Sequence, residues 1–273
     1  MVEQRRAVIK LGGGLITEKS GLCEPDHDSI RISTGAIASL VEEGWIIALV
    51  HGAGSFGHAK AKRWRLTEGP VDADLGEEDG ITNQLEAVKA VRQDMMNLNR
   101  LVTNALSEHG IDSVTYHPHK WARGTGENFT GNLDFLGKNK VTITYGDVVD
   151  VGDDGFGILS GDDIMLRIAK EWKDVESCIF CLADCDGILT HPPGHTDSTL
   201  LNTWDPSVGF GGRHESEIDV TGGIDYKALR AASIAQTVPL VWFVDGRFPT
   251  RIVDACNGSN TIGTRIFYSP VRL

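Results

Sequence analysis

Short apolar runs alternate along the chain with longer segments in which apolar residues recur every three or four positions. Most of the short runs show no polar–apolar alternation and end at glycine or aspartate, which is typical of buried parallel strands. The alternation of the two kinds of segment predicts an α/β protein with a mostly parallel sheet. The predicted strands are Ala7–Leu11, Ile46–Val50, Ser113–Tyr116, Ser177–Ala183 and Leu240–Val244, and the predicted helices are Ser29–Glu43, Thr82–Glu108, Asp162–Trp172 and Gly223–Gln236.

Two kinds of segment depart from this alternation. Val141–Leu159 carries an Asp-Asp-Gly turn between apolar flanks, which predicts a β-hairpin. Three other segments, Thr67–Gly80, His119–Asn139 and His191–Asp219, are long, polar and rich in glycine, proline or aspartate. We expect them to be loops, and loops of this length in a compact domain are often lids or binding segments.

The net charge of the chain limits the classes of binding partner that we expect. The 273 residues are 41% hydrophobic and carry a formal net charge of −12, which argues against general binding to nucleic acid or to an anionic membrane. No apolar run approaches the roughly 20 residues needed to cross a bilayer. The first residues lead into a strand without a signal-peptide apolar region, so we expect a cytoplasmic protein. An anionic substrate would require a locally basic site.

The five cysteines are too few for a disulfide framework in a chain of this length. Cys178, Cys181 and Cys185 have a spacing that resembles a metal site, but they fall in a predicted buried strand, and no second pair lies at zinc-site spacing. We therefore expect them to pack as small hydrophobic side chains.

The first motif with chemical potential is KLGGG, which begins at Lys10 and is followed by Lys19. Glycines at the carboxyl end of a strand allow backbone N–H groups to approach a ligand and form an anion-binding nest. A lysine on the strand just before that turn would project beside the same site. A tight glycine turn with surface lysines would account for this motif equally well.

A second glycine-rich loop, HGAGSFGH, runs from His51 to His58 directly after a predicted strand. Because open α/β sheets bind ligands at the carboxyl ends of their strands, the two glycine-rich turns indicate a shared site. Neither turn has the spacing of a dinucleotide fingerprint or a Walker loop. His58 falls where the next helix should begin, so its imidazole could hydrogen-bond a phosphate bound by the glycine amides. We expect His51 to be structural.

Three acidic clusters follow predicted strands or precede predicted helices. They are SGDD at 160–163, DCDG at 184–187, and DVTGG at 219–223, which leads into the helix that carries Lys227. Aspartate caps and turns would explain each cluster singly, with an aspartate of SGDD as the helix cap. Together with a lysine, the three clusters fit a site that holds nucleotide phosphates and Mg²⁺.

The order and spacing of KLGG, HGAGSFGH, YGDV, SGDD, D-x-DGI, DVTGG and IGTRI resemble the amino acid kinase superfamily along essentially the whole chain. The loop ending in His58, with YGDV, SGDDIM and DVTGGI-x-x-K, is similar in particular to the isopentenyl phosphate kinases. The resemblance implies a three-layer αβα sandwich with a mostly parallel central sheet. It also implies one continuous structural domain, with an acceptor lobe at 1–175 and a nucleotide lobe at 176–273, and commonly a homodimer.

The activity implied by the resemblance is transfer of the γ-phosphoryl group of ATP to isopentenyl phosphate, with dimethylallyl phosphate as an alternative acceptor. The products would be isopentenyl diphosphate and ADP, in isoprenoid precursor biosynthesis by the alternative mevalonate pathway. Lys10 would stabilise the transferring phosphoryl group, and Lys19 would neutralise phosphates. Asp162 would orient the lysines, and Lys227 would reach the β- and γ-phosphates. His58 would donate a hydrogen bond to the acceptor phosphate. The other residues implied for the acceptor are Gly12, Gly13, Gly52, Ala53, Gly54, Gly57, Ser160 and Gly161.

The resemblance implies a nucleotide site with Mg²⁺ held mainly by the ATP phosphates and no metal ligands from the protein. Two positions depart from the family on this side. Ala183 stands where the family usually has a threonine, and Asp225-Tyr226 replaces small or basic residues. The residues implied for the nucleotide are Lys10, Gly12, Asp184, Asp186, Gly187, Thr221, Gly222 and Lys227.

A phosphate acceptor agrees with the absence of an obvious catalytic base in these motifs. A phosphate monoester has a second pKa of about 6, so at neutral pH it is largely a dianion and already a nucleophile. The obstacle is charge repulsion, since two unit charges about 4 Å apart interact by roughly 4 kcal/mol at an effective dielectric constant of about 20. The lysines, Mg²⁺, His58 and the loop amides are suited to offset it.

The other end of the acceptor would need an apolar pocket. Ile81–Leu106 predicts a helix, and one face of it could wall a pocket for a five-carbon tail. Most stripes of this kind are simply part of the core. The apolar residues of the helix include Leu85, Val88, Met95, Leu98 and Val102.

Three other functions fit part of the pattern. A fosfomycin-type phosphonate kinase also places a histidine in the glycine loop, but SGDDIM with DVTGGI favours the isoprenoid acceptor. An amino-acid or carbamate kinase would leave His58 without an obvious purpose. A catalytically silent ATP-binding regulatory protein on the same fold is disfavoured by the presence of Lys10, Asp162 and Lys227.

Overall fold

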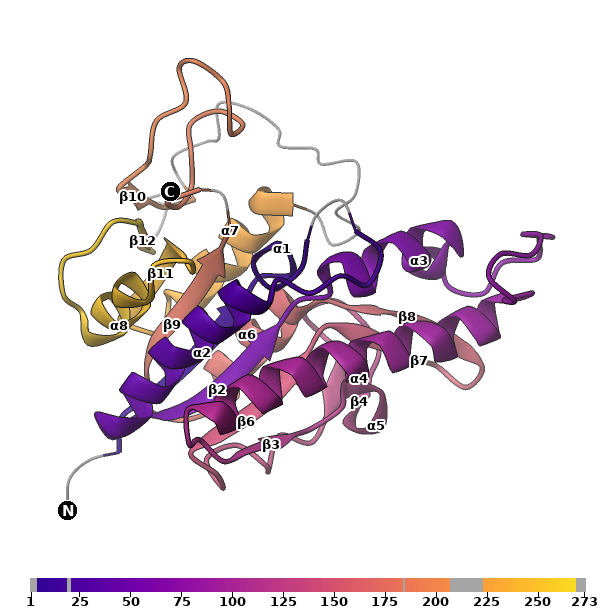
Figure 1. Cartoon of the computed structure of the whole chain (residues 1–273), viewed down its shortest axis with the longest axis horizontal. Helices are drawn as coiled ribbons and strands as arrows, with labels where there is room; N and C mark the ends of the chain where they lie inside the picture. Colours follow the sequence, from indigo (N-terminus) through magenta and orange to yellow (C-terminus); the bar gives the residue numbers. More distant parts are fainter. Residues whose placement is uncertain (1–3, 19–20, 184, 207–222, 269–273) are drawn as a thin grey trace, which may run out of the picture.

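The computed structural model describes residues 4–18, 21–183, 185–206 and 223–268. Their main feature is an eight-stranded sheet with the strand order β10-β12-β11-β9-β1-β2-β6-β3, in which β11, β9, β1, β2, β6 and β3 run parallel (Figure 1). All five predicted strands are in this sheet. The strands are β1 (Arg6–Leu11), β2 (Ile46–His51), β3 (Ser113–Thr115), β6 (Val141–Tyr145), β9 (Val175–Leu182), β10 (Thr203–Trp204), β11 (Leu240–Asp245) and β12 (Thr264–Ile266).

Helices cover both faces of the sheet. One face carries α2 (His27–Glu42), α4 (Gln84–Glu108) and α8 (Pro249–Asn257), whose buried side chains share one apolar cluster. The other face carries α6 (Gly161–Glu171) and α7 (Gly223–Ile234), which belong to a second cluster. Figure 1 shows α2 and α4 on one side of the strands. The arrangement is a three-layer αβα sandwich, which confirms the fold class expected from the sequence.

The two clusters explain why the central strands are apolar without alternation. Successive strand residues point to opposite faces, so Ile9 packs under α2 whereas Val8 packs on the side of α6. In β2, Leu49 likewise belongs to the cluster under α2 and α4, whereas Val50 belongs to the cluster under α6 and α7. Because both faces are covered by helices, both sets of side chains must be apolar.

Polar side chains fix the beginnings of the long helices. Asp26 accepts a hydrogen bond from the Ser29 amide at the start of α2 (2.8 Å), and Asn83 accepts one from the Glu86 amide at the start of α4 (3.0 Å). At the start of α6 the cap is Ser160, whose hydroxyl accepts from the Asp162 amide (3.2 Å). The expectation that an aspartate caps this helix is therefore wrong, and the Asp162 carboxylate is left available for other contacts.

The prediction of a single hairpin over Val141–Leu159 is wrong in its first part. β6 joins the main sheet parallel to β2, and only β7 (Asp147–Val151) and β8 (Gly155–Leu159) pair with each other, around the Asp-Asp-Gly turn. The chain changes sheets at Gly146, whose N–H donates to the carbonyl of His51 (3.1 Å). This bond is the last contact of the segment with β2, and Asp147, the next residue, begins β7 in the second sheet.

The predicted loop at His119–Asn139 contains short regular elements. After α5 (Pro118–Trp121), the strands β4 (Ala122–Arg123) and β5 (Thr130–Gly131) complete a second sheet of order β5-β4-β7-β8. Such two-residue strands depend on pairing with distant residues, so no local pattern predicts them. The remaining short elements are α1 (Gly13–Ile16), η1 (Gly54–Phe56), α3 (His58–Arg63) and η2 (Leu66–Glu68).

Two other expectations concern burial and membranes. Cys178 and Cys181 are free, fully buried residues of β9, as expected for packing side chains, and burial raises the pKa of both thiols. Cys185 is half-buried. Among the described residues, no helix is long and apolar enough to cross a bilayer.

The loops that follow the central strands approach one another through backbone alone. The Gly12 amide donates to Cys181 O (2.9 Å) and the Gly52 amide donates to Leu11 O (2.9 Å). A Cβ atom added to Gly13 would lie 2.2 Å from the Gly54 nitrogen, and one added to Gly52 would lie 2.5 Å from the Gly13 nitrogen. Glycine is required here because side chains would separate the two loops.

We expect Gly13→Ala to lower the free energy of unfolding by about 1–3 kcal/mol, because the added methyl group overlaps the backbone of the neighbouring loop. Equilibrium urea unfolding measures the change. Gly14→Ala is the matched control, since Gly14 is the next residue of the same turn and is exposed. Equal stability of Gly13→Ala and Gly14→Ala would show that the loops are not packed this closely.

Candidate active site

A cavity of about 470 Å³ lies at the edge of the sheet where β1, β2, β6 and β9 end. The glycine-rich loops after β1 and β2 line it together with the residues between β8 and α6. The structure thus brings together motifs that are more than 200 residues apart in the chain. The predicted site residues that line the cavity are Lys10, Gly12, Gly13, Gly52, Ala53, Gly57, His58, Ser160, Gly161, Gly187 and Lys227.

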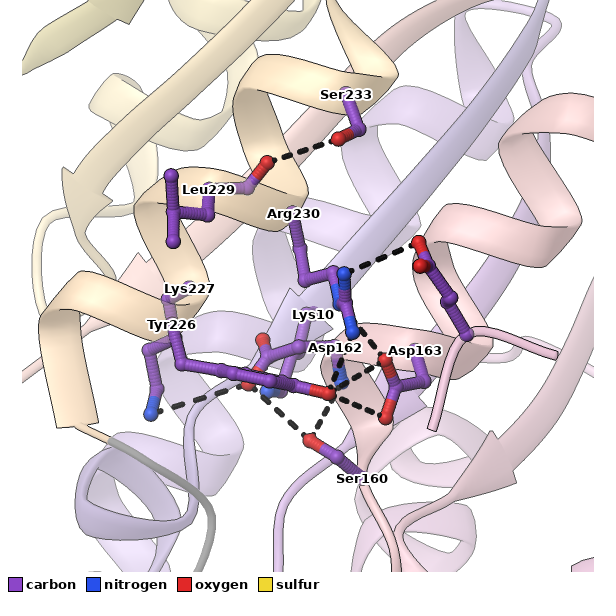
Figure 2. A network of polar contacts seen from close by, with 10 residues as sticks. Lys10, Ser160, Asp162, Asp163, Tyr226, Lys227, Leu229, Arg230 and Ser233 are labelled. Atoms are coloured by element: carbon purple, nitrogen blue, oxygen red, sulfur yellow. Dashed lines mark hydrogen bonds and ion pairs between the residues drawn. The ribbon is translucent and has the colours of Figure 1, made fainter. Parts of the chain in front are cut away.

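The charged centre of the site is the carboxylate of Asp162, which has no exposed surface. The Lys10 ammonium donates a hydrogen bond to Oδ1 of this carboxylate, and Lys227 Nζ lies 3.9 Å from its Oδ2 (Figure 2). Lys227 also donates to the carbonyl of Gly223, at the start of its own helix (3.2 Å). One carboxylate therefore holds two ammonium groups at the wall of the cavity, and the three side chains together carry a net positive charge.

Local structure explains why a carboxylate is stable in this buried position. Asp162 lies in the first turn of α6, where the helix dipole favours negative charge. Gly161 makes room for the lysine, because a Cβ atom at this position would lie 3.2 Å from Lys10 Cε. The carboxylate is thus approached by Lys10 on one side and the Ser160 hydroxyl on the other.

His58 is the first residue of α3, as the sequence predicts, and it lines the cavity directly after the second glycine loop. Gly54 does not line the cavity. It has a φ of +49°, and a Cβ atom there would lie 2.0 Å from the hydroxyl of Thr17. Gly54 therefore shapes the turn that carries the loop to His58.

His51, expected to be structural, is fully buried beneath the loop. Its ring stacks on Tyr145 at a centroid distance of 4.8 Å, and Nδ1 lies 3.0 Å from the carbonyl oxygen of Gly52. Burial lowers the pKa of His51 to about 4, so the imidazole is neutral at pH 7. A neutral ring that supports the loop from below has no direct contact with the cavity.

Asp147 lines the cavity and was missed as a site residue, although the YGDV motif that contains it follows a strand end. Its buried carboxylate lies 2.7 Å from His119 Nδ1 and accepts a hydrogen bond from the Val148 amide (2.8 Å). These partners hold the carboxylate toward α5. A carboxylate held in this way does not act as an obvious base for a group in the cavity.

The apolar wall of the cavity combines two parts of the molecule. One part is the α3–α4 layer, and the other is the β7–β8 hairpin of the second sheet. Met95 was predicted as a wall residue and lines the cavity, whereas Leu85 is 63% exposed and the other three named helix residues are buried in the core. The apolar lining residues of these elements are Ala61, Val91, Met95, Val148, Ile158 and Leu159.

The predicted nucleotide residues are only partly described. Gly187 lines the cavity with Ala183 and Cys185. Asp186 does not line it, and its carboxylate accepts a hydrogen bond from Arg251 (2.5 Å). Lys19, Asp184, Thr221 and Gly222 lie outside the described residues. Within the described ranges, no group of three or more His, Cys, Asp or Glu side chains is arranged to hold a metal ion.

Comparisons with known proteins agree with this geometry. Residues 5–241 match the amino acid kinase family. The isopentenyl phosphate kinase of Thermoplasma acidophilum is 32% identical over 252 residues, covering 90% of this chain and 94% of the relative. The isopentenyl phosphate kinase of Arabidopsis thaliana is 27% identical over 289 residues, covering 85% of this chain and 84% of the relative.

Solved structures give the same result. The crystal structure of the T. acidophilum isopentenyl phosphate kinase product complex superposes with a TM-score of 0.76 at 26% identity, covering 95% of this chain and 99% of that one. UMP kinase from Ureaplasma parvum, at 13% identity and a TM-score of 0.54, shares the fold. The chain therefore belongs to the amino acid kinase family and, within it, to the isopentenyl phosphate kinases.

Proposed function

We propose that this chain transfers the γ-phosphoryl group of ATP to isopentenyl phosphate and releases isopentenyl diphosphate and ADP. The observation that carries the proposal is the composition of one cavity. Its lining combines Lys10, Lys227, His58 and two glycine-rich loops with apolar side chains from α3, α4 and the β7–β8 hairpin. A small phosphate ester with an alkyl tail is complementary to both parts of this lining. The relatives named above support the same acceptor.

In this proposal the second glycine loop binds the acceptor phosphate. The amides of Gly52 and Ala53 and the imidazole of His58 would donate hydrogen bonds to its oxygens, whereas Gly54, implied by the resemblance for the same role, lies outside the cavity and would shape the turn. The five-carbon tail would extend between α4 and the β7–β8 hairpin, toward Met95. Because the acceptor phosphate is already a dianion at neutral pH, its oxygen can attack without a general base.

Lys10 and Lys227 would stabilise the charge that spreads over the transferring phosphoryl group. Phosphoryl transfer depends mainly on positioning and electrostatic stabilisation, and both ammonium groups are fixed by Asp162 before substrates arrive. Lys19 would add a third cation. Mg²⁺, carried on the ATP phosphates, would supply further positive charge that neutralises part of the charge of the triphosphate.

We also propose the division of labour implied by the motifs. Residues 1–175 would bind the acceptor, and residues 176–273, with Asp184, Asp186, Gly187, Thr221 and Gly222, would bind the nucleotide. The enzyme would act in the cytoplasm as a homodimer.

The acceptor is tested with purified protein, ATP and Mg²⁺ in an assay that couples ADP release to a spectroscopic signal. We expect turnover of isopentenyl phosphate and none of isopentenol, because the alcohol lacks the phosphate that His58 and the loop amides would bind. Dimethylallyl phosphate and fosfomycin are tested as alternative acceptors in the same assay. Activity on fosfomycin alone would identify a phosphonate kinase, and activity on no acceptor would indicate a catalytically silent ATP-binding protein.

We expect His58→Ala to lower kcat/KM for isopentenyl phosphate by roughly 10²-fold, the scale of losing one preorganised donor to a charged oxygen. The dissociation constant for ATP should stay unchanged, because His58 lies in the acceptor loop. His27→Ala is the matched control, since His27 is also the first residue of a helix but is exposed. Equal kinetics of His58→Ala and His27→Ala would remove His58 from the acceptor site.

The role of Lys10 in catalysis can be separated from its role in stability. We expect Lys10→Met to abolish measurable turnover and to lower the free energy of unfolding by roughly 3–5 kcal/mol, because Asp162 loses the cation at its Oδ1. Adding Asp162→Asn removes the buried charge and should restore most of the stability but none of the turnover. Urea unfolding and the coupled assay measure the two effects. Turnover by the stable double variant would exclude Lys10 from the chemistry.

A further inference from the structure

A second polar network lies beside the active-site lysines, on the side away from the cavity. Tyr226 of α7 donates its hydroxyl hydrogen to the Asp163 carboxylate of α6, with oxygen distances of 2.7 and 2.8 Å. Arg230, one turn further along α7, donates to Asp163 Oδ1 (2.8 Å) and to the Tyr226 oxygen (2.9 Å). Figure 2 shows both side chains pointing from α7 toward the first turn of α6. We call Asp163, Tyr226 and Arg230 the α6–α7 clasp.

The three side chains of the clasp contact one another and are largely shielded from solvent, unlike a surface ion pair. The Asp163 side chain is 2% exposed, and the Arg230 guanidinium lies over the Tyr226 ring at 4.6 Å from its centroid. Arg230 also reaches Glu127, in the loop between β4 and β5, with a distance of 3.2 Å. Burial raises the pKa of Tyr226 to about 12, so the hydroxyl stays protonated and continues to donate at neutral pH.

The clasp and the catalytic centre share the same two helical turns. Asp162 and Asp163 are consecutive in the first turn of α6, and Tyr226 and Lys227 are consecutive in the first turns of α7. Asp162 faces the lysines, whereas Asp163 faces the clasp. Fixing the Tyr226 hydroxyl on Asp163 therefore also fixes the helical turn from which Lys227 extends.

We propose that Tyr226 and Arg230 are positioning residues that hold Lys227 at the carboxylate of Asp162 for phosphoryl transfer. Lys227 Nζ lies 3.9 Å from Asp162 Oδ2 and 3.2 Å from the carbonyl oxygen of Gly223, so its position depends on where the first turns of α7 lie relative to α6. The hydrogen bonds of the clasp, which are 2.7–2.9 Å long, fix the position of the first turns of α7 relative to the first turn of α6. This proposal rests on the proposed kinase function, because it concerns the same lysine.

The clasp also prevents the second aspartate from competing for the lysine. Asp163 is adjacent to Asp162, and an unpaired buried carboxylate there would attract Lys227 away from the cavity. Tyr226 and Arg230 occupy both oxygens of Asp163. The aromatic residue before Lys227 thus has a specific structural partner in this chain.

Tyr226→Phe tests the proposal because it removes one hydroxyl and keeps the ring. We expect kcat to fall at least tenfold, since a small displacement of a catalytic group has effects of this size, while KM for isopentenyl phosphate stays unchanged. The melting temperature is measured in parallel to confirm folding. Tyr116→Phe is the matched control, because Tyr116 is half-buried and its ring stacks on Phe135 away from the cavity. Arg230→Lys, which keeps the charge without the planar fork, should show a smaller loss of kcat in the same direction.

A double-mutant cycle with Lys227→Ala distinguishes positioning from general stabilisation. If Tyr226 acts through Lys227, adding Tyr226→Phe to Lys227→Ala should cause no further loss of kcat or of affinity for ATP. A fully additive loss, or wild-type kcat in Tyr226→Phe, would overturn the proposal. The same cycle is also measured with ATP affinity as the readout, by calorimetry with Mg²⁺-ATP and without an acceptor. If the wild-type protein binds ATP but does not phosphorylate isopentenyl phosphate, the proposed function alone is overturned. The double-mutant cycle in ATP affinity still tests whether the clasp positions Lys227.

Discussion

The active site depends on the contacts of the buried Asp162 carboxylate with the ammonium groups of Lys10 and Lys227. A fully buried charge is costly unless it is paired, and here Lys10 comes from the centre of the sheet while Lys227 comes from the helix layer. The carboxylate therefore joins the two layers electrostatically at the cavity wall. It also fixes two flexible lysine side chains in advance, so that little of their conformational entropy is lost when substrates bind.

This local pairing explains how an acidic protein can handle anionic substrates. The net charge of −12 is distributed over the whole chain, whereas among the described residues the wall of the cavity places Lys10 and Lys227 on the buried Asp162. Asp147, a further buried carboxylate of the described lining, contacts His119 and the Val148 amide. Both of these carboxylates are thus bound by cations or by backbone and imidazole donors.

The sequence predicted those features that depend on local pattern. Apolar runs predicted five of the eight strands of the central sheet, and the glycine loops, with His58, followed the ends of two of these strands. Features that depend on distant pairing were not predictable in this way. β6 leaves the expected hairpin because it pairs with β2, and β4 and β5 owe their place to the sheet that β4 forms with β7. Tyr226 was noted in the sequence as an unusual residue before Lys227, but nothing in the sequence identified Asp163 and Arg230 as its partners.

The apolar and charged parts of the cavity come from different structural units, and this separation matters for specificity. The lysines and glycine loops lie at the ends of central strands, where close backbone approach leaves little freedom for substitution. The wall that would surround an alkyl tail comes from α4 and from the β7–β8 hairpin, which belongs to a separate sheet. In the proposed binding mode, side chains such as Met95 and Ile158 would contact the tail, whereas Lys10 and Asp162 would act at the transferring group. The fit of the acceptor tail and the chemistry of transfer would therefore depend on separate sets of contacts.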